Sequence, residues 1–189
     1  VAVWRHVDDA LAGLCLSEMR TATRLADLGA GAGLPGLVLA IALPDTCVTL
    51  VESVERKCRF QRLAAAACGC DNVRVLHSRA ESWREGRSTQ DLVTARALAP
   101  LAVLVEYAAP LLIEGGSLVA WKGAVAKDEA EAGARAAAVV GLKSVEPVLL
   151  PPFPNGGGGR TLQRYLKVMP TPERFPRRAG MARKRPLAA

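Results

Sequence analysis

The sequence predicts an α/β protein with a mostly parallel sheet that ends in an antiparallel pair. Short β-branched or apolar segments alternate with helical ones along most of the chain, which is typical of a parallel sheet. Three alternate glycines, Gly29, Gly31 and Gly33, directly follow the first predicted strand. The last two predicted strands are joined by the Pro- and Gly-rich loop 151–159 instead of a helix, which indicates an antiparallel pair.

Seven segments have the length and composition of strands: 23–28, 47–52, 72–77, 91–96, 117–122, 144–150 and 160–168. Four segments have helical patterns: 36–43, 53–69, 101–112 and 126–140. Pro35 stands where the first turn of a helix tolerates proline, and Gly69 ends the second helix. The third helix is expected to end before Gly115 and Gly116.

Length and composition bound the class of protein. A chain of 189 residues that is 50% hydrophobic has the size of one domain and can bury a sizeable core. We expect a domain over 1–169 and a basic, irregular tail over 170–189. No apolar run reaches the roughly 20 residues of a membrane span, and no apolar signal segment opens the chain. Because the sequence begins with Val1, we expect a truncated protein.

The five cysteines predict no disulfide framework and no metal site. Their number is odd, no C-x-x-C pair occurs, and only two histidines are available to complete a zinc site. We therefore expect reduced, mostly buried thiols, as in a cytoplasmic protein.

The positive charge is concentrated near the carboxyl end. Nine of the 25 Lys and Arg residues, with only one of the 18 Asp and Glu residues, lie from Arg160 onward, a balance of +8 against −1 for the rest. This asymmetry favours an anionic partner, nucleic acid before membrane. The tail cations, with Phe175 among them, have the composition of a strip that binds an RNA backbone: Arg174, Arg177, Arg178, Arg183, Lys184 and Arg185. A tail that only improves solubility is the alternative.

The glycine loop can be read in two frames. Residues 31–36 match G-x-G-x-x-G, the fingerprint of dinucleotide binding, but begin two residues after the strand ends. Residues 29–33 form G-x-G-x-G directly after the strand, preceded by Asp27, a pattern that many S-adenosylmethionine (SAM) enzymes use. Glu52 ends the second strand, where its carboxylate can accept both ribose hydroxyls of either cofactor. The combination favours SAM and leaves a nicotinamide cofactor open.

A resemblance extends over nearly the whole chain. The segments RHVDDAL, DLGAGAGLPGLVLAI, VTLVESVERKCRF, SRAESW, VTARALAPL, LVAWKG and GMARKRPL resemble, in order, the small-subunit ribosomal RNA methyltransferase G family, formerly named glucose-inhibited division protein B. The resemblance implies a Rossmann-like fold with a seven-stranded sheet and transfer of a methyl group from SAM to N7 of one guanine in the 530 loop of 16S ribosomal RNA. Two differences stand out: Ala10 replaces a family serine, and a helical portion that precedes RHVDDAL in the family is absent.

The resemblance also implies roles for individual residues. Gly29 and Leu34 match positions that contact SAM, and Ala80 and Glu81 match the pair beside the adenine. Arg96 matches an arginine of the cofactor and active site. The remaining family polar positions, which serve RNA or catalysis, are His6, Lys57, Arg79 and Lys122, with Lys57 interchangeable in alignment with Arg56.

The residues themselves agree with chemistry that needs no general base. N7 of guanine has a free lone pair and no proton, so orientation and electrostatics suffice. Residues 95–100 lack the Asn/Asp-Pro-Pro-aromatic tetrad of amine-directed methyltransferases. Arg96 ends a strand at the sheet edge where such folds bind ligands, and suits guanine O6; ion pairing with Asp91 or Glu106 is the structural alternative. Lys122 ends the next strand at the same edge.

We therefore predict a cytoplasmic, bacterial or organellar, monomeric methyltransferase. SAM lies on Gly29, Gly31, Gly33 and Leu34, with Glu52 at the ribose. The partner is 16S ribosomal RNA, free or in the small subunit or its assembly intermediate, held partly by Lys57, Arg79, Arg177, Arg178 and Lys184. Small-molecule methylation, an NAD-dependent oxidoreductase and a non-catalytic RNA-binding module are the alternatives. Salt sensitivity and cofactor-induced stabilisation separate them.

Overall fold

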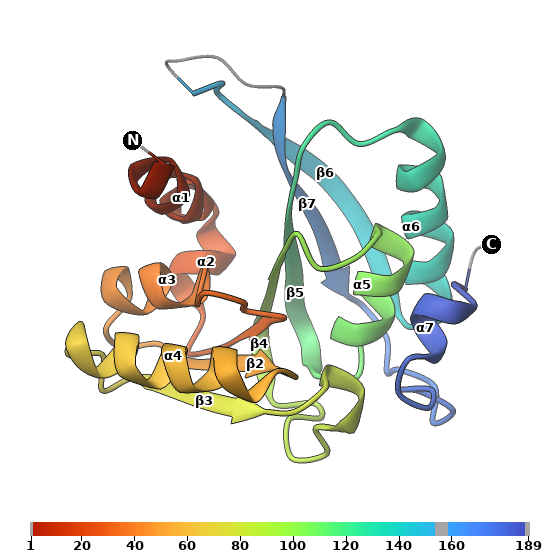
Figure 1. Ribbon diagram of the computed structural model, residues 1–189. Helices are drawn as coiled ribbons and strands as arrows, with labels where there is room; N and C mark the ends of the chain where they lie inside the picture. The colour runs from red at the N-terminus through yellow and green to blue at the C-terminus, as the bar shows by residue number, and fades with distance from the viewer. Residues whose placement is uncertain (1, 154–158, 188–189) are drawn as a thin grey trace.

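The computed structural model describes residues 2–153 and 159–187 and consists of one seven-stranded sheet with helices on both faces (Figure 1). The strands are β1 Arg24–Leu28, β2 Cys47–Glu52, β3 Val73–His77, β4 Gln90–Arg96, β5 Leu112–Lys122, β6 Leu142–Leu150 and β7 Arg160–Lys167. The α-helices are α1 Ala2–Leu11, α2 Ser17–Thr21, α3 Gly36–Ala42, α4 Glu55–Ala67, α5 Leu101–Ala108, α6 Lys127–Val139 and α7 Met181–Lys184. Two 3-10 turns, η1 Ala12–Cys15 and η2 Ala80–Ser82, complete the elements.

The strand order is β3-β2-β1-β4-β5-β7-β6, and β7 alone runs antiparallel to its neighbours. The predicted mostly parallel sheet with an antiparallel end is confirmed. Both β2 and β4 pair with β1, so the strand order reverses there, and open α/β sheets bind ligands at the carboxyl ends beside this reversal. The glycine loop after β1, the acidic end of β2 and the basic end of β4 all lie at this edge.

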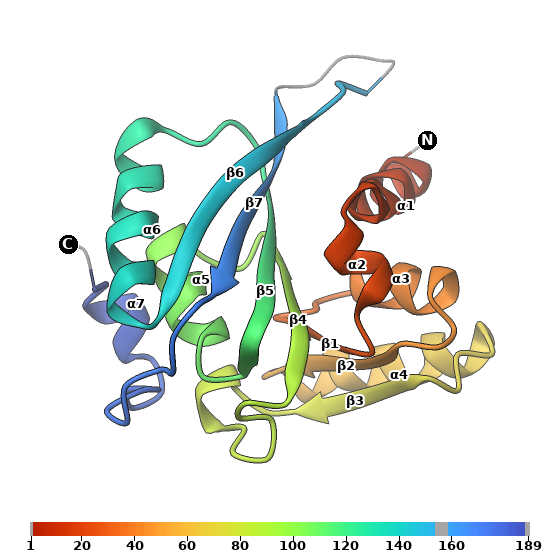
Figure 2. The same cartoon turned by 180° about the vertical axis from the view of Figure 1, so that it is seen from behind.

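The sheet has a hydrophobic cluster on each face. Helices α5 and α6 contribute the first cluster, together with Ala26 and Leu28 of β1. The second contains Met19 of α2, Leu39 of α3, Ala65 of α4 and Leu25 of β1. Because neighbouring residues of a strand point to opposite faces, β1 contributes to both clusters and is almost completely buried. The sheet lies between α1–α4 and α5–α7 in both views (Figures 1 and 2).

Two predicted boundaries differ from the structure by more than two residues. Helix α5 ends at Ala108 instead of Leu112, because Pro110 has no N–H to continue the helix. Strand β5 begins at Leu112, five residues earlier than predicted, and passes through Gly115 and Gly116 instead of starting after them. Gly115 has φ +81°, and the register against β4 shifts in this region, so the glycines form an irregularity within the strand.

The carboxyl-terminal residues are less irregular than predicted. Phe175 and Ala182 are buried in the first hydrophobic cluster, and α7 follows Gly180. The residues between β7 and α7 contain no helix or strand. The segment therefore packs against α5, while the domain boundary at residue 169 stays a prediction.

The thiols are only partly as expected. All five cysteines are free, but Cys58 alone is buried, and Cys15, Cys47 and Cys68 are exposed. The prediction of mostly buried thiols is wrong because three of these positions fall at element ends, where the chain meets solvent.

Candidate cofactor and acceptor sites

The loop after β1 is held open by backbone conformations that glycine adopts readily. Gly29, Gly31 and Gly33 have φ angles of +63°, +59° and +85°. At Gly29 a Cβ atom would lie 2.4 Å from Leu98 Cδ1, so the loop and the residues after β4 approach closely. The N–H groups of Gly29 and Ala30 both donate to the carbonyl of Val51 in β2.

Asp27 fixes the base of this loop. Its carboxylate accepts hydrogen bonds from the Gly36 N–H at the start of α3 (3.0 Å) and from the Thr94 hydroxyl of β4 (2.9 Å). The side chain is completely buried, and this burial raises the pKa of Asp27 to about 7, against the opposing effect of the two hydrogen bonds and of Arg96. Asp27 therefore joins β1, β4 and the start of α3 behind the glycines.

Glu52, which we predict to accept the ribose hydroxyls, also accepts hydrogen bonds from the protein backbone. Its Oε2 accepts the N–H of Gly31 (3.0 Å), and its Oε1 accepts the N–H groups of Ser53 and Val54. The carboxylate is nearly buried and thus positions the glycine loop. Oε2 accepts only one of these protein donors and keeps capacity for a ligand hydroxyl.

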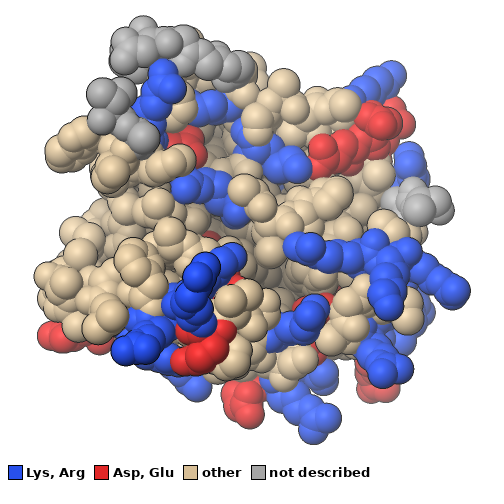
Figure 3. All heavy atoms as spheres, viewed as in Figure 1, with Lys and Arg blue, Asp and Glu red and all other residues tan. Residues whose placement is uncertain are grey.

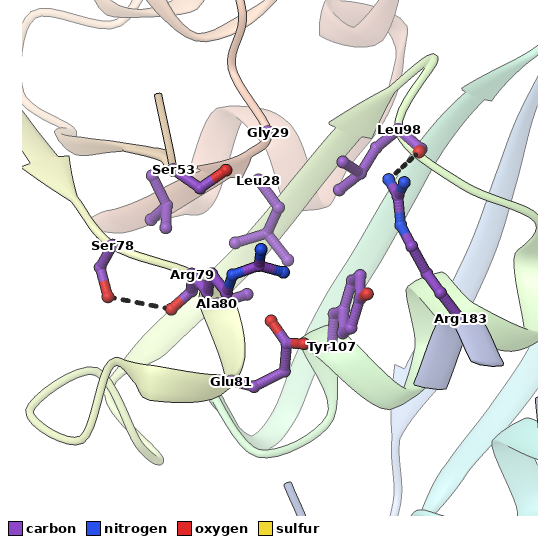
Figure 4. A pocket seen from close by; sticks show the side chains of 11 residues that line it. Leu28, Gly29, Ser53, Ser78, Arg79, Ala80, Glu81, Leu98, Tyr107 and Arg183 are labelled. Atoms are coloured by element: carbon purple, nitrogen blue, oxygen red, sulfur yellow. Dashed lines mark hydrogen bonds between the residues drawn. The ribbon is translucent and has the colours of Figure 1, made fainter. Parts of the chain in front are cut away.

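A cavity of about 210 Å³ lies beside the glycine loop (Figure 4). Its wall joins the ends of β1, β2 and β3 to the residues after β4 and to α5 and α7. The lining residues are Leu28, Gly29, Val51, Ser53, Ser78, Arg79, Ala80, Glu81, Leu98, Tyr107 and Arg183. The predicted positions Gly29, Ala80 and Glu81 thus meet at one cavity, whereas Glu52 lies behind it, between the lining residues Val51 and Ser53. The predicted loop residues Gly31, Gly33 and Leu34 follow Gly29 along the loop, beyond this lining.

A second cavity, of about 560 Å³, lies on the other side of the residues that follow β4. Ala97 lines this cavity and Leu98 lines the first, so the two cavities share this short segment. The three predicted catalytic side chains, His6, Arg96 and Lys122, all line the second cavity although 116 residues of sequence separate the first from the last.

Asp9 organises the second cavity. Its two carboxylate oxygens accept from Arg96 Nη1 (3.2 Å) and from Arg160 Nη1 (3.0 Å), and its backbone carbonyl accepts from Trp121 Nε1 (2.7 Å). The partner of Arg96 is therefore Asp9, and neither Asp91 nor Glu106. The Arg160 guanidinium lies 3.7 Å from the centre of the Phe153 ring, a cation–π distance.

The other predicted site residues lie apart from the second cavity. Lys57 is on α4, 4.0 Å from the Glu52 carboxylate, and Arg79 lines the first cavity. Arg178 and Lys184 are exposed on the carboxyl-terminal segment. Arg177 is partly buried in an ion pair with Glu106 of α5.

Lys122, which lines the second cavity, pairs with Glu129 of α6 at 2.7 Å. The same carboxylate oxygen of Glu129 accepts the N–H of Leu101 at the start of α5. Lys122 is therefore held at the rim of the second cavity by a residue that also fixes the first turn of a helix.

Sequence reasoning missed part of both cavities. Leu98, Tyr107 and Arg183 in the first cavity, and Asp9 and Arg160 in the second, had no assigned role in the site. The position of Leu98, two residues after Arg96, was the one available signal. The others depend on packing between distant segments, which no local pattern reports.

Known proteins resemble this chain over most of its length. The model of a family described as rRNA small subunit methyltransferase G matches residues 2–150. The chain belongs to this family. The ribosomal RNA small subunit methyltransferase G of Rubrobacter xylanophilus is 41% identical over 187 residues, which cover 96% of this chain and 72% of the relative. The protein of the same description from Roseiflexus castenholzii is 44% identical, over 98% of this chain and 79% of the relative.

Solved structures agree on the fold. The W203A mutant of a 16S rRNA (adenine(1408)-N(1))-methyltransferase from Catenulisporales acidiphilia superposes with a TM-score of 0.66 at 16% identity, over 87% of this chain and 92% of the neighbour. A predicted O-methyltransferase from Agrobacterium tumefaciens superposes with a TM-score of 0.66 at 22% identity, over 84% of this chain and 80% of the neighbour. The Rossmann-like methyltransferase fold predicted from the family resemblance is confirmed.

Proposed function

We propose that this member of the family transfers a methyl group from SAM to N7 of a guanine in the 530 loop of 16S ribosomal RNA. The observation that carries the proposal is the pair of adjacent cavities: one beside the glycine loop, the other where His6, Arg96 and Lys122 meet. The residues after β4 separate the two cavities, so a cofactor and an acceptor base would approach each other across this segment.

The residues of the first cavity suit SAM. Gly29 has a positive φ and no side chain of its own, so the loop backbone can approach a ligand closely, and Leu98 lies against this glycine from the residues after β4. The Glu52 carboxylate, beneath the loop, keeps a free acceptor for the ribose hydroxyls, and Glu81 and Ala80 offer a polar and an apolar contact for the adenine ring. Gly31, Gly33 and Leu34 shape the loop around the methionine part.

This reaction needs no general acid or base from the protein. SAM supplies a methyl group activated by its positively charged sulfonium. Because N7 of guanine carries a lone pair and no proton, no base has to remove a proton, and the side chains need only to hold the guanine in line with the methyl group. The second cavity fits this task, since Asp9 holds the guanidinium groups of Arg96 and Arg160 in place.

Arg96 is the residue that we assign to the guanine. Arginine recognises the O6 and N7 edge of guanine through its N–H donors, and Arg96 Nη1 is already oriented by Asp9. While N7 is alkylated, O6 remains an acceptor for Arg96. Lys122 and His6 lie on the same cavity, where they can contact the phosphates beside the target base.

The surface charge supports an RNA partner. Lys and Arg side chains gather over the part of the molecule where α7 lies, and others lie over α4 (Figure 3). Lys184 is in α7, Arg178 shortly precedes it and Lys57 is in α4, and all three are exposed. In the described ranges 2–153 and 159–187, no helix has the length and apolarity needed to cross a bilayer. Action on ribosomal RNA in a bacterial cytoplasm, by a monomer, completes the proposal.

The test is nucleoside mass spectrometry of small-subunit ribosomal RNA or 30S particles from cells that lack this modification. Incubation with SAM and the protein should produce 7-methylguanosine at one position, and Arg96→Ala should reduce the rate at least about a hundredfold, the effect of about 2.7 kcal/mol. Arg135→Ala, on the exposed face of α6, serves as the matched control and should leave the rate unchanged. Methylation at another atom, or none by a chain that binds SAM, would contradict the proposal.

A further inference from the structure

The carboxyl-terminal segment reaches the first cavity from outside the Rossmann-like core. Arg183 of α7 is one of the residues that line this cavity, opposite Ser53, which follows β2, and Ser78, which follows β3 (Figure 4). Its Nη2 donates to the carbonyl oxygen of Leu98 at 2.7 Å. Leu98 is the side chain that lies against Gly29, so Arg183 is attached to the segment that also contacts the glycine loop.

Other contacts fix this segment independently of Arg183. Phe175 and Ala182 are buried against the α5 side of the sheet, and Arg177 pairs with the buried Glu106 of α5. The N–H of Gly180 donates to Glu81 Oε1 at 2.9 Å, so the segment orients a side chain that itself lines the cavity. The position of Arg183 is thus set by packed neighbours, unlike that of a cation on a free tail.

The surroundings of Arg183 indicate which part of SAM it meets. Leu98, Tyr107 and Ala80 provide apolar surface, and Glu81 provides an acceptor, whereas the glycines that approach the methionine part lie on the β1 side. Apolar side chains beside a hydrogen-bond acceptor suit an aromatic ring that carries an amino group. A guanidinium group is planar, stacks on aromatic rings and donates to ring nitrogens, so it recognises a purine in either way.

We infer that Arg183 is a cofactor-binding residue that closes the adenine side of the SAM cavity, instead of an RNA-contacting member of the basic tail. The inference rests on the proposed function, because it assigns the ligand of the same cavity. It divides the basic tail into two groups. Arg183, although exposed, and Arg177 donate hydrogen bonds to other elements of the protein. Among the residues that the structure describes, the exposed side chains of the second group donate no such bond to another element: Arg174, Arg178, Lys184 and Arg185.

The test is isothermal titration calorimetry of the full chain with SAM and with S-adenosylhomocysteine, without RNA. Arg183→Ala should raise the Kd for both ligands at least about tenfold and by the same factor, because both contain the adenine ring. Arg183→Lys should give an intermediate Kd, since lysine keeps the charge but not the planar group. Arg178→Ala, which removes an exposed arginine from the same segment, should change neither Kd by more than about twofold.

The outcomes separate the inference from the proposed function. A folded Arg183→Ala variant, judged by circular dichroism, that binds both ligands within twofold of the wild type overturns the inference and leaves the proposed function intact. A variant that binds SAM more tightly while S-adenosylhomocysteine is unaffected also overturns it, because Arg183 would then act only by repelling the sulfonium. A wild-type chain that binds neither ligand overturns the proposed function and the inference together.

Discussion

Asp27 shows how one residue can connect the stability of the fold to the shape of the site. It lies in β1, an interior strand of the sheet, is completely buried, and its two carboxylate oxygens accept hydrogen bonds from Gly36 and Thr94. Burial raises its pKa to about 7, so the folded protein holds a proton there that the unfolded chain releases near its ordinary value of 3.8. Stability is therefore linked to pH through this single group.

The sign of this linkage gives a prediction. Because the pKa of Asp27 is raised by folding, its contribution to stability is complete below pH 3.8 and is lost as the pH rises through about 7. Asp27→Asn removes the titration and can still accept from Gly36 and donate to Thr94, so the difference in unfolding free energy should favour Asn increasingly between pH 4 and pH 8. The full change is up to about 4 kcal/mol, at about 1.4 kcal/mol per pKa unit. Urea unfolding across this range measures it; a difference independent of pH would contradict it.

Gly29 and Gly31 have similar backbone conformations, so alanine substitutions at the two positions can be compared directly. Both have positive φ angles near +60°, so alanine at either position should destabilise the fold by about 1–3 kcal/mol. They differ in space: a Cβ at Gly29 would lie 2.4 Å from Leu98, whereas at Gly31 the nearest atom is 3.7 Å away. Gly29→Ala must displace the Leu98 side chain, which lines the cavity, and should raise the Kd for SAM about tenfold more than Gly31→Ala. Calorimetric titration compares them, and equal Kd values would show that Leu98 moves away without cost.

The sequence could predict site residues that directly follow strands. It could not predict those that reach the site through contacts between segments far apart in the sequence. Gly29 and Arg96 were predicted from their positions just after and at the end of a strand, where the fold places ligands, and Ala80 from the resemblance of its segment SRAESW to the family. Arg183 was predicted for RNA, since a local run of cations contains no sign of which one donates a hydrogen bond to the residues after β4. Asp9 was missed because its partners Arg96 and Arg160 lie 87 and 151 residues away in the sequence, so no local pattern indicates the contact.

At the scale of elements, a buried ion pair attaches the carboxyl-terminal segment to α5. Glu106 is only 2% exposed, within a helix whose residues are all buried. Arg177 donates from Nε to Glu106 Oε1 at 2.7 Å and from Nη2 to Oε2 in a two-pronged contact, and this raises the pKa of Arg177. The same Nη2 donates to the carbonyl of Arg185 beyond α7. The pair therefore attaches the segment that carries Arg183.

This arrangement predicts an asymmetric double-mutant cycle. Arg177→Ala leaves a buried carboxylate without its cation and should cost about 3–5 kcal/mol of unfolding free energy. Glu106→Gln leaves Arg177 able to turn to solvent and should cost less. The double variant should be more stable than Arg177→Ala alone, because the unpaired charge is gone. Urea unfolding at pH 7 measures all three, and strict additivity would mean that the pair is not coupled.

The elements themselves were largely predictable, and the exceptions have local causes. Strands such as β2 are continuous apolar or β-branched runs, as buried parallel strands are. The short helix α7 lies in a stretch without hydrophobic periodicity, and its formation depends on the burial of Ala182. Strand β5 continues through Gly115 because Leu112 pairs with Gln90 before the glycines and Ser117 pairs with Leu92 after them, so β4 holds the strand at both ends of the irregularity.

At the scale of the whole molecule, the exposed cations that gather near the carboxyl end of the chain lie in a different region from the two cavities. The exposed cations of the carboxyl-terminal segment lie over the α7 side, whereas the two cavities open beside the carboxyl ends of the parallel strands (Figures 1 and 3). Arg183 joins these two regions, because it belongs to the basic segment and lines a cavity. An RNA held by the exposed cations would thus lie close to the cofactor without needing Arg183 or Arg177.

The last prediction concerns that electrostatic surface. Replacing four exposed cations with alanine, Arg174, Arg178, Lys184 and Arg185, should weaken binding of a 530-loop RNA and flatten its dependence on salt. Removing one contact between a cation and a phosphate reduces the slope of log K against log salt concentration by about 0.7 for single-stranded RNA, so the slope should fall by about 2–3. The Kd for SAM should stay unchanged, because Arg183 is retained.

The control removes two exposed cations elsewhere. Lys127 and Arg135 of α6 both pair with Glu131, and their double replacement should leave the slope as it is in the wild type. Fluorescence anisotropy at several KCl concentrations measures all the slopes. Equal slopes for the wild type and the fourfold variant would mean that the tail only improves solubility, and that α4 and the second cavity supply the RNA contacts.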